Sequence, residues 1–244
     1  MTPERPRTEE FYLEYDSLTQ RQGEWTALGY NRYQKFDTGT WFVQLQGTNR
    51  SGNGEGASVL GVAGAYKDWN PWFFTYTAVS TSTNSQWTPR FRVDQDFNFK
   101  VGPKRSTVLT AGLTNIWYHQ DPRQDFIYSG GITQYFGQFN VEFRHFWNTS
   151  NPGNVGSQSN SVAVGYDNEG DMRASVTYGW GREAYLGSLV VSLPPTVSQR
   201  SSSWMFTYRK WTSPTAGFFV TGQWINVAPG YALSGGQAGY FHNF

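Results

Sequence analysis

Apolar and polar residues alternate with a period of two along the chain from Phe11 to the last residue, and helical periodicity is nearly absent. In residues 90–101 one face carries Arg, Asp, Asn and Lys side chains, and the other carries mostly Phe and Val. Residues 139–148 and 172–180 repeat this alternation. Because successive side chains of a strand point to opposite faces, the pattern predicts an all-β chain.

Turn-forming Gly, Pro, Asn and Asp residues divide the chain into short segments. Short turns are expected at residues 37–40, 69–71, 102–105, 136–138, 168–171 and 213–215. Longer polar connections are expected at residues 19–24, 50–56, 80–89, 149–158 and 185–200. The segments between them predict about 14 strands, with 12 and 16 as the neighbouring counts.

Two architectures fit an antiparallel sheet of this size. A soluble sandwich, propeller or jelly roll has its apolar face inside, whereas a transmembrane barrel turns its apolar face to lipid and has a polar lumen. Alternation alone does not distinguish the two.

Three features favour a single closed transmembrane barrel. Tryptophans cluster near strand ends, where the aromatic girdles of membrane barrels lie. The polar faces carry both signs of charge, and the chain ends on a strand pattern with Tyr240 and Phe244 on one face. The predicted girdle residues are Trp25, Trp41, Trp72, Trp117, Trp147, Trp180, Trp204, Trp211 and Trp224.

Composition excludes several other classes of protein. The net charge of +1 gives no reason to expect a nucleic-acid partner, and the 18% aromatic content excludes a disordered chain. The absence of Cys removes disulfides, thiol chemistry and Cys-based metal sites. No run of about 18 apolar residues is present, so a transmembrane helix is not expected.

This architecture predicts an N-terminal periplasmic tail over residues 1–10 and an outer-membrane barrel over residues 11–244. An even strand number places both termini in the periplasm, with short periplasmic turns and longer extracellular loops. If the apolar faces meet lipid, the lumen is lined by Glu14, Asp16, Arg32, Gln44, Gln46, Arg90, Arg92, Asp94, Asp96, Lys100, Glu142, Arg144, Arg173 and Arg209. Such a ladder of nearly balanced charges is either the lining of a selective pore or a salt-bridged network that closes the barrel.

The last strand resembles the terminal signal by which the barrel-assembly machinery recognises bacterial outer-membrane barrels. Phe244 and Tyr240 occupy its aromatic positions, and His242 departs from its preference for an apolar or aromatic residue. More broadly, the chain resembles the YaiO-type outer-membrane β-barrel family, in residues 11–15, in residues 29–33 and in a repeated cadence of Gly followed by an aromatic residue.

The resemblance implies a location in the bacterial outer membrane, in contact with lipid and lipopolysaccharide. Some relatives carry helical repeats before the barrel and are associated with envelope polysaccharide machinery. Such repeats are not expected here, because the strand pattern of the sequence begins by Phe11. The family supplies no catalytic motif to map.

Enzymatic chemistry has little support in the residues themselves. His119, with Asp121 and Asp125 nearby, could activate a water at the extracellular rim, or it could be a histidine that simply bonds a neighbour at a loop base. Neither a metal-ligand spacing nor a Gly-x-Ser-x-Gly elbow is present, so no metal and no cofactor are expected. The apolar segment 185–197 is expected to form a plug, a strand extension or a docking site for a partner.

The sequence therefore predicts a pore or channel that guides a small polar or saccharide molecule across the outer membrane, with a link to envelope polysaccharide export implied by the resemblance. Two alternatives stay open. One is a closed scaffold barrel that anchors an envelope complex through its loops, and the other is a rim-located hydrolase that uses His119.

Overall fold

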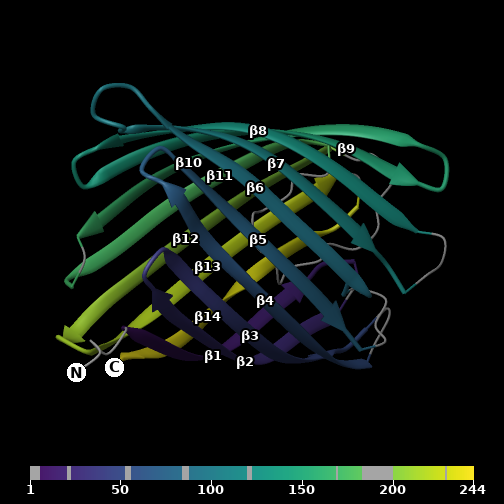
Figure 1. Ribbon diagram of the computed structural model, residues 1–244. Coiled ribbons are helices and arrows are strands. Elements are labelled where there is room, and N and C mark those ends of the chain that lie inside the picture. The colour runs from purple at the N-terminus through teal and green to yellow at the C-terminus, as the bar shows by residue number, and fades with distance from the viewer. Residues whose placement is uncertain are drawn as a thin grey trace.

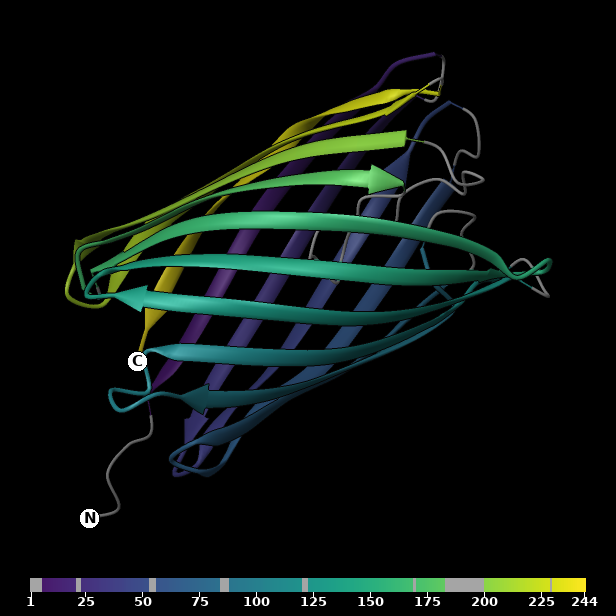
Figure 2. The ribbon, with the colours of Figure 1, turned by 90° about the horizontal axis from the view of Figure 1, so that it is seen from above.

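The fold is one closed antiparallel barrel of fourteen strands, seen from the side in Figure 1 and from above in Figure 2. The computed structural model describes residues 6–20, 23–52, 56–83, 88–119, 123–168, 170–182, 200–228 and 230–244. The strands are β1 (Arg7–Leu18), β2 (Gly23–Phe36), β3 (Gly39–Arg50), β4 (Gly56–Asn70), β5 (Phe73–Ser82), β6 (Phe91–Val101), β7 (Thr107–Trp117), β8 (Gln124–Phe136), β9 (Phe139–Asn151), β10 (Val155–Asn168), β11 (Met172–Arg182), β12 (Arg200–Ser213), β13 (Ala216–Ala228) and β14 (Ala232–Asn243). Each strand pairs with the next along the chain, and β14 pairs with β1. The predicted all-β barrel and its strand number are confirmed.

The two ends of the barrel differ in their connections. Where β1 begins and β14 ends, the connections are residues 37–38, 71–72, 102–106, 137–138, 169–171 and 214–215. At the opposite end they are residues 19–22, 51–55, 83–90, 118–123, 152–154, 183–199 and 229–231. Outer-membrane barrels keep their short turns in the periplasm, so the first end is called periplasmic below and the second extracellular.

Two sequence boundaries differ from the prediction. The long connection predicted over residues 149–158 is wrong, because β9 continues to Asn151 and β10 begins at Val155. This stretch has the composition of a loop because the inner wall of a barrel accepts small polar side chains such as Ser157. In addition, β1 begins at Arg7, so residues 7–10 are part of the first strand and not of a tail.

Apolar side chains cover the outside of the barrel. Leu13 and Leu28 are 66% and 63% exposed, whereas Tyr12, which points inward from the same strand as Leu13, is only 4% exposed. A soluble sandwich would show the opposite arrangement, so the exposed apolar surface distinguishes the two architectures. The part of the chain that the structure describes contains no helix that could cross a membrane.

Several inward aromatic rings lie against glycines on the neighbouring strand. A Cβ atom added to Gly29 would lie 2.0 Å from Cζ of Tyr12, and one added to Gly64 would lie 2.5 Å from Cζ of Phe42. In both cases the glycine is the direct cross-strand partner of the ring. The missing side chain therefore makes room for an aromatic ring to lie along the inner wall, a known device for glycine in sheets.

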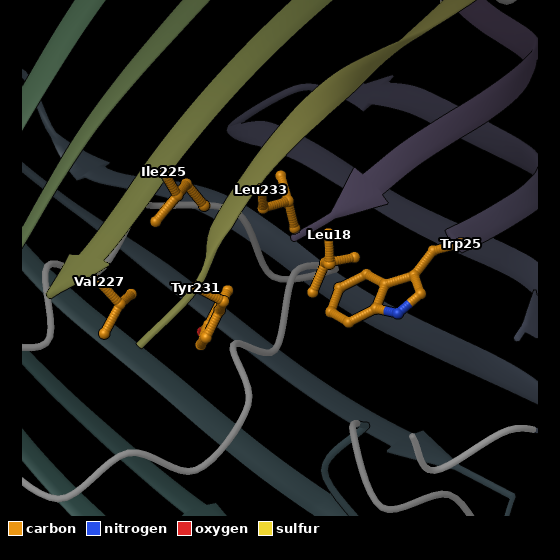
Figure 3. Packing of buried hydrophobic residues seen from close by; sticks show 6 residues of the cluster. All are labelled: Leu18, Trp25, Ile225, Val227, Tyr231 and Leu233. Carbon is orange, nitrogen blue, oxygen red and sulfur yellow. The ribbon is translucent and has the colours of Figure 1, made fainter. Parts of the chain in front are cut away.

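Three groups of inward apolar residues are packed in the lumen. One of them, on β1 and β12 to β14, consists of Tyr12, Phe219 and Phe241, with Trp211 packed against it. The extracellular cluster, shown in Figure 3, consists of Leu18, Trp25, Ile225, Val227, Tyr231 and Leu233. The aromatic cluster lies nearer the periplasmic end, on β2 to β5, and consists of Tyr33, Phe42, Tyr66 and Tyr76.

Candidate functional site

The inner face of the barrel carries most of the charged and amide side chains that the sequence assigned to the lumen. Their position follows from the alternation of exposed and buried residues along each strand. The inward residues are Glu14, Asp16, Gln44, Gln46, Arg92, Asp94, Asp96, Lys100, Glu142, Arg144, Arg173 and Arg209.

Two assigned residues lie elsewhere. Arg32 points outward, on the same face of β2 as Leu28, and its guanidinium lies 5.6 Å from the ring centre of Trp41. It lies near the periplasmic end, where a charge on the outer face meets polar headgroups. Arg90 is exposed in a bend before β6, where its carbonyl accepts a 2.8 Å hydrogen bond from Thr81 Oγ1.

The assigned girdle residues also divide between the two faces. On the outer face, Trp41 and Trp72 lie at the periplasmic level, and Trp117, Trp147, Trp180, Trp204 and Trp224 lie at the extracellular level. Trp25 and Trp211 point inward instead. Trp25 belongs to the extracellular cluster (Figure 3), and Trp211 packs against Phe241 with ring centres 5.1 Å apart. A position near a strand end does not decide which face a tryptophan occupies, because both faces of a barrel accept aromatic rings there.

An ion pair along the inner wall joins β9 to β6. Arg144 donates to Asp96 through two nitrogens at 2.6 and 3.1 Å, and it also donates to the hydroxyl of Ser129 on β8. On β7, one of the two strands between β6 and β9, a Cβ atom at Gly112 would lie 2.3 Å from the Asp96 carboxylate. The pair therefore crosses two intervening strands because one of them has no side chain at that point.

A second ion pair joins β12 to β1. Arg209 donates to Glu10, which also accepts a 2.9 Å hydrogen bond from Asn31 Nδ2. The Arg209 guanidinium lies 3.6 Å from the ring centre of Phe241, which supports it from below. Sequence reasoning missed Glu10 because it assigned residues 1–10 to a tail.

Other inward cations also have acidic partners. Arg92 donates to both oxygens of Asp94 at 2.8 Å. Near the periplasmic mouth, Arg173 contacts Asp167 at 2.8 Å and Lys100 contacts Asp68 at 3.6 Å; these two pairs are more exposed.

A carboxylate pair lies beside the extracellular cluster. Glu14 accepts a 2.8 Å hydrogen bond from Gln46, and Asp16 accepts one of the same length from Gln223. Arg50 is buried nearby, with its guanidinium 3.9 Å from the ring centre of Trp25. The sequence contained the signal for Arg50, since it lies on the same face of its strand as Gln46.

The inner faces of β10 and β11 differ from the rest of the lumen because they carry only small residues above the periplasmic mouth. These inward residues, called the small-residue wall below, are Ser157, Ser159, Ser161, Ala163, Gly165, Ser175, Thr177 and Gly179. In the closed ring of fourteen strands, β11 lies seven positions from β4 in either direction, so this wall faces the aromatic cluster.

Solvent contact differs between inward side chains. Tyr66 of the aromatic cluster is 48% exposed although it points inward, so the lumen has open space beside it. Asp16, Ile225 and Leu233, toward the extracellular end, are 0% exposed, as is Phe241 near the periplasmic end. These residues are therefore packed against their neighbours and not against open lumen.

His119 contacts a serine at the extracellular rim. Its Nε2 lies 3.3 Å from Oγ of Ser82, and Ser82 donates its hydroxyl proton to the carbonyl of Pro89 at 2.8 Å. A carbonyl can only accept, so the histidine must be the donor to Ser82, which is the reverse of a general base.

Of the two aspartates expected near His119, only Asp125 is among the described residues, and its hydrogen bond goes to another side chain. Asp125 accepts a 2.8 Å hydrogen bond from the Tyr118 hydroxyl, and burial followed by the charge of Asp125 raises the pKa of Tyr118 above its ordinary value. Asp121 and the segment 185–197 lie outside the described residues. Among the residues that are described, no group of three His, Asp or Glu side chains could hold a metal ion.

Tyr240 and Phe244, the residues of the expected assembly signal, share the outer face and are both exposed. His242 lies on the same face with its ring centre 4.4 Å from that of Phe244. The Arg7 guanidinium lies 4.1 Å from the ring centre of Phe244, so the first and last strands meet at this point.

Comparison with known proteins identifies a family and a fold. The model of the YaiO membrane beta barrel domain matches residues 8–186, which is more than half of the chain. No match was found among curated protein sequences.

Solved structures with the same architecture have low sequence identity. The CymD monoaromatic hydrocarbon channel is 9% identical, with a TM-score of 0.58 over 100% of this chain and 89% of that one. Omp33 of Acinetobacter baumannii is 9% identical, with a TM-score of 0.54 over 98% of this chain and 99% of that one. The KdgM porin is 8% identical, with a TM-score of 0.49 over 96% and 99% of the two chains.

Proposed function

Because the chain belongs to the YaiO membrane β-barrel family, we propose that its lumen is a passage for a small polar or saccharide solute across the outer membrane. The chain is a β-barrel of the bacterial outer membrane, and its structural neighbours include a hydrocarbon channel and a porin. What those neighbours carry is a property of those proteins. The proposal for this chain depends on its own lumen.

The observation that carries the proposal is the pairing of two unlike walls across the lumen. On one side the aromatic cluster exposes Tyr66, and on the other the small-residue wall presents the hydroxyls of Ser161, Ser175 and Thr177. A sugar has apolar faces of C–H groups and a rim of hydroxyls. The C–H faces of the sugar would pack on the aromatic rings, and its hydroxyls would hydrogen-bond with the serines and threonines. Polar groups fix the orientation of a ligand in a mostly apolar site in this way.

The charges of the lumen support a neutral solute over a strongly charged one. Five inward cations are each paired with a carboxylate, as described above. Among the other inward residues of the strands, Glu14, Asp16, Asp125 and Glu142 are carboxylates, against the cations Arg50 and, at the periplasmic end, Lys35. The lining therefore carries a small excess of negative charge, and we expect weak selectivity for cations over anions.

Single-channel recording of the refolded barrel in a planar bilayer tests this function. We expect steady conductance steps, weak cation selectivity in a salt gradient, and partial block by a glucose trimer added to one side. Heat-modifiable gel mobility shows that the barrel is folded. Steps that the trimer does not alter would contradict the saccharide assignment.

The runner-up function is a closed scaffold barrel, which the burial of Asp16, Ile225 and Leu233 favours. A folded but silent barrel would support it. Replacing Trp25 and Leu233 together by Ala removes the bulk of the extracellular cluster and separates the two functions. Conductance that appears only in this variant would indicate a passage that the cluster closes, and continued silence would support the scaffold.

We also propose that Tyr240 and Phe244 are read by the barrel-assembly machinery during insertion. Their exposure on one outer face near the periplasmic end supports this proposal. Phe244→Ser should lower the amount of folded protein in the outer membrane, whereas refolding in detergent should be unaffected.

A further inference from the structure

The outer face of β11 and β12 ends at the extracellular rim in two arginines. Arg182 and Arg200 are direct cross-strand partners, and both side chains are exposed. An anion that contacted both guanidinium groups would gain charge-assisted hydrogen bonds from each of them.

Aromatic rings lie immediately below the arginines on the same face. The ring centres of Tyr178 and Trp180 are 5.5 Å apart in a stacked arrangement, and those of Tyr178 and Trp204 are 4.6 Å apart. A groove of about 950 Å³ lies at this level, and Trp180, Arg182 and Arg200 are among the residues that line it. This volume can hold a sugar-sized headgroup.

A second hollow continues toward the middle of the membrane. It has a volume of about 650 Å³, shares Tyr178 and Trp180 with the groove above, and is otherwise lined by Val162, Val164, Val176 and Trp204. From the rim downward, the surface is therefore cationic, then aromatic, then aliphatic. Lipids of the outer leaflet have the matching order of anionic headgroup, polar backbone and acyl chains.

Polar side chains accompany the aromatic level on the lipid-facing side. Gln158 lines the groove, and Asn160 lies two residues further along the same face of β10. The Asn160 side-chain oxygen lies 2.7 Å from Nδ1 of His145 on β9. Amide groups facing lipid are unfavourable unless they have polar neighbours, so a ligand with hydroxyl or amide groups suits this level better than hydrocarbon.

We propose that this surface binds a phosphorylated glycolipid of the outer leaflet. Its phosphate lies between Arg182 and Arg200, its sugar ring packs on Trp180 near Gln158, and an acyl chain occupies the hollow lined by Val162, Val164 and Val176. The site lies on the outside of the barrel and is independent of what passes through the lumen.

The rest of the rim provides a matched control. Among the described residues, Arg182 and Arg200 are the only outward arginines that pair directly across two strands. Arg90 and Arg123 lie at the same end but before different strands, and the Arg123 guanidinium lies 4.2 Å from the ring centre of Tyr118.

Native mass spectrometry of the folded barrel in detergent tests the proposal, with bis-phosphorylated lipid A as the probe. We expect one lipid A to stay bound to the unmodified protein, and R182Q/R200Q to bind it at least about tenfold more weakly, since each charge-assisted bond is among the stronger hydrogen bonds. R90Q/R123Q should bind within about twofold of the unmodified protein. Heat-modifiable mobility confirms that every variant is folded.

Two further probes identify the ligand. Lipid A without its phosphates should bind the unmodified protein as weakly as lipid A binds R182Q/R200Q. Phosphatidylglycerol, which has a phosphate but no sugar, should bind more weakly than lipid A. In Trp180→Ala, the difference in affinity between the two lipids should be smaller than in the unmodified protein. Unchanged lipid A binding by R182Q/R200Q, equal loss in R90Q/R123Q, or equally tight phosphatidylglycerol binding would each overturn the proposal.

Discussion

The wall formed by β3 to β5 and the wall formed by β10 and β11 face each other across one lumen, yet they are built by different rules. In the first, rings such as Phe42 are buried against glycines of the next strand. In the second, the inward residues of the small-residue wall are no larger than threonine, and larger side chains such as Arg173 lie only at the periplasmic mouth. The first wall gains stability from packing inside the barrel, whereas the second leaves space and presents hydroxyls.

This difference shows that a barrel lumen can have a structural side and an open side at the same height. In a soluble protein, the apolar interior is the core on all sides. Here the exposed apolar outside already matches the lipid, so the inner face is free to divide between packing and passage.

The largest effect is expected when bulk is added to the small-residue wall. Ser175→Trp should place an indole in the open side of the lumen and lower single-channel conductance about fivefold. Its control is Val176→Trp, the next residue, which points to lipid and is already exposed. An equal loss of conductance in both variants would show that the substitution acts through folding and not by filling the lumen.

A second test removes the space that glycine provides on the packed wall. In Gly64→Ala, the added Cβ would lie 2.5 Å from the Phe42 ring and 2.7 Å from the backbone oxygen of Thr77, so the strand must shift. We expect the free energy of unfolding to fall by about 1–3 kcal/mol, measured in urea by tryptophan fluorescence. Gly156→Ala on β10 is the comparison, because a Cβ there meets nothing within 4 Å. Gly156 points outward, so it controls for the loss of a strand glycine; equal harm in Gly156→Ala would mean that the space beside Phe42 is not what Gly64 provides.

A smaller effect is expected from the ion pair that runs from β6 to β9 between the two walls. The double-mutant cycle of Arg144→Gln and Asp96→Asn should give a coupling free energy of about 0.5–2 kcal/mol in urea unfolding. The corresponding cycle for Arg173 and Asp167, which are more exposed, should give less than about 0.5 kcal/mol. A coupling near zero for Arg144 would mean that the pair does not stiffen the wall.

The smallest effect is expected at the rim, outside both walls. His119→Ala removes only a long contact to Ser82, so conductance and unfolding should stay within error of the unmodified protein. Esterase and phospholipase assays should show no activity in either protein. If the unmodified protein hydrolyses a substrate and His119→Ala does not, the hypothesis of a rim-located hydrolase would be supported.

Much of the fold could be read from the sequence because each strand repeats one rule. Alternation in residues 90–101 correctly placed Arg92, Asp94 and Asp96 on one face, and the turn residues gave the strand number. This reading assumes that every polar residue of a strand points inward. It fails on the parts of the outer face that lie beyond the hydrocarbon region, where polar residues can also point outward. Arg32 is such a case.

The contacts inside the lumen could not be read from the sequence. The pair of Arg144 and Asp96 spans three strand spacings, and its path depends on a missing side chain at Gly112. Trp25 was assigned to the girdle because it lies near a strand end, but the closure of the barrel places it in one packed cluster with Ile225 and Leu233, about 200 positions away. Such neighbours are set by the ring of strands and not by local pattern.

The closing of β14 on β1 has a consequence for how the chain folds. It joins residues as distant as Thr8 and Asn243, whose side chains are hydrogen-bonded although they are 235 positions apart. Contacts of such separation require the largest loop closure, so they slow folding and form late. Until they form, both strands have an unpaired edge that can pair with another chain. The rate at which β14 pairs with β1 should therefore determine which fraction of the molecules folds into the barrel and which fraction aggregates. The stability of the packed clusters in the lumen should matter less for this partition.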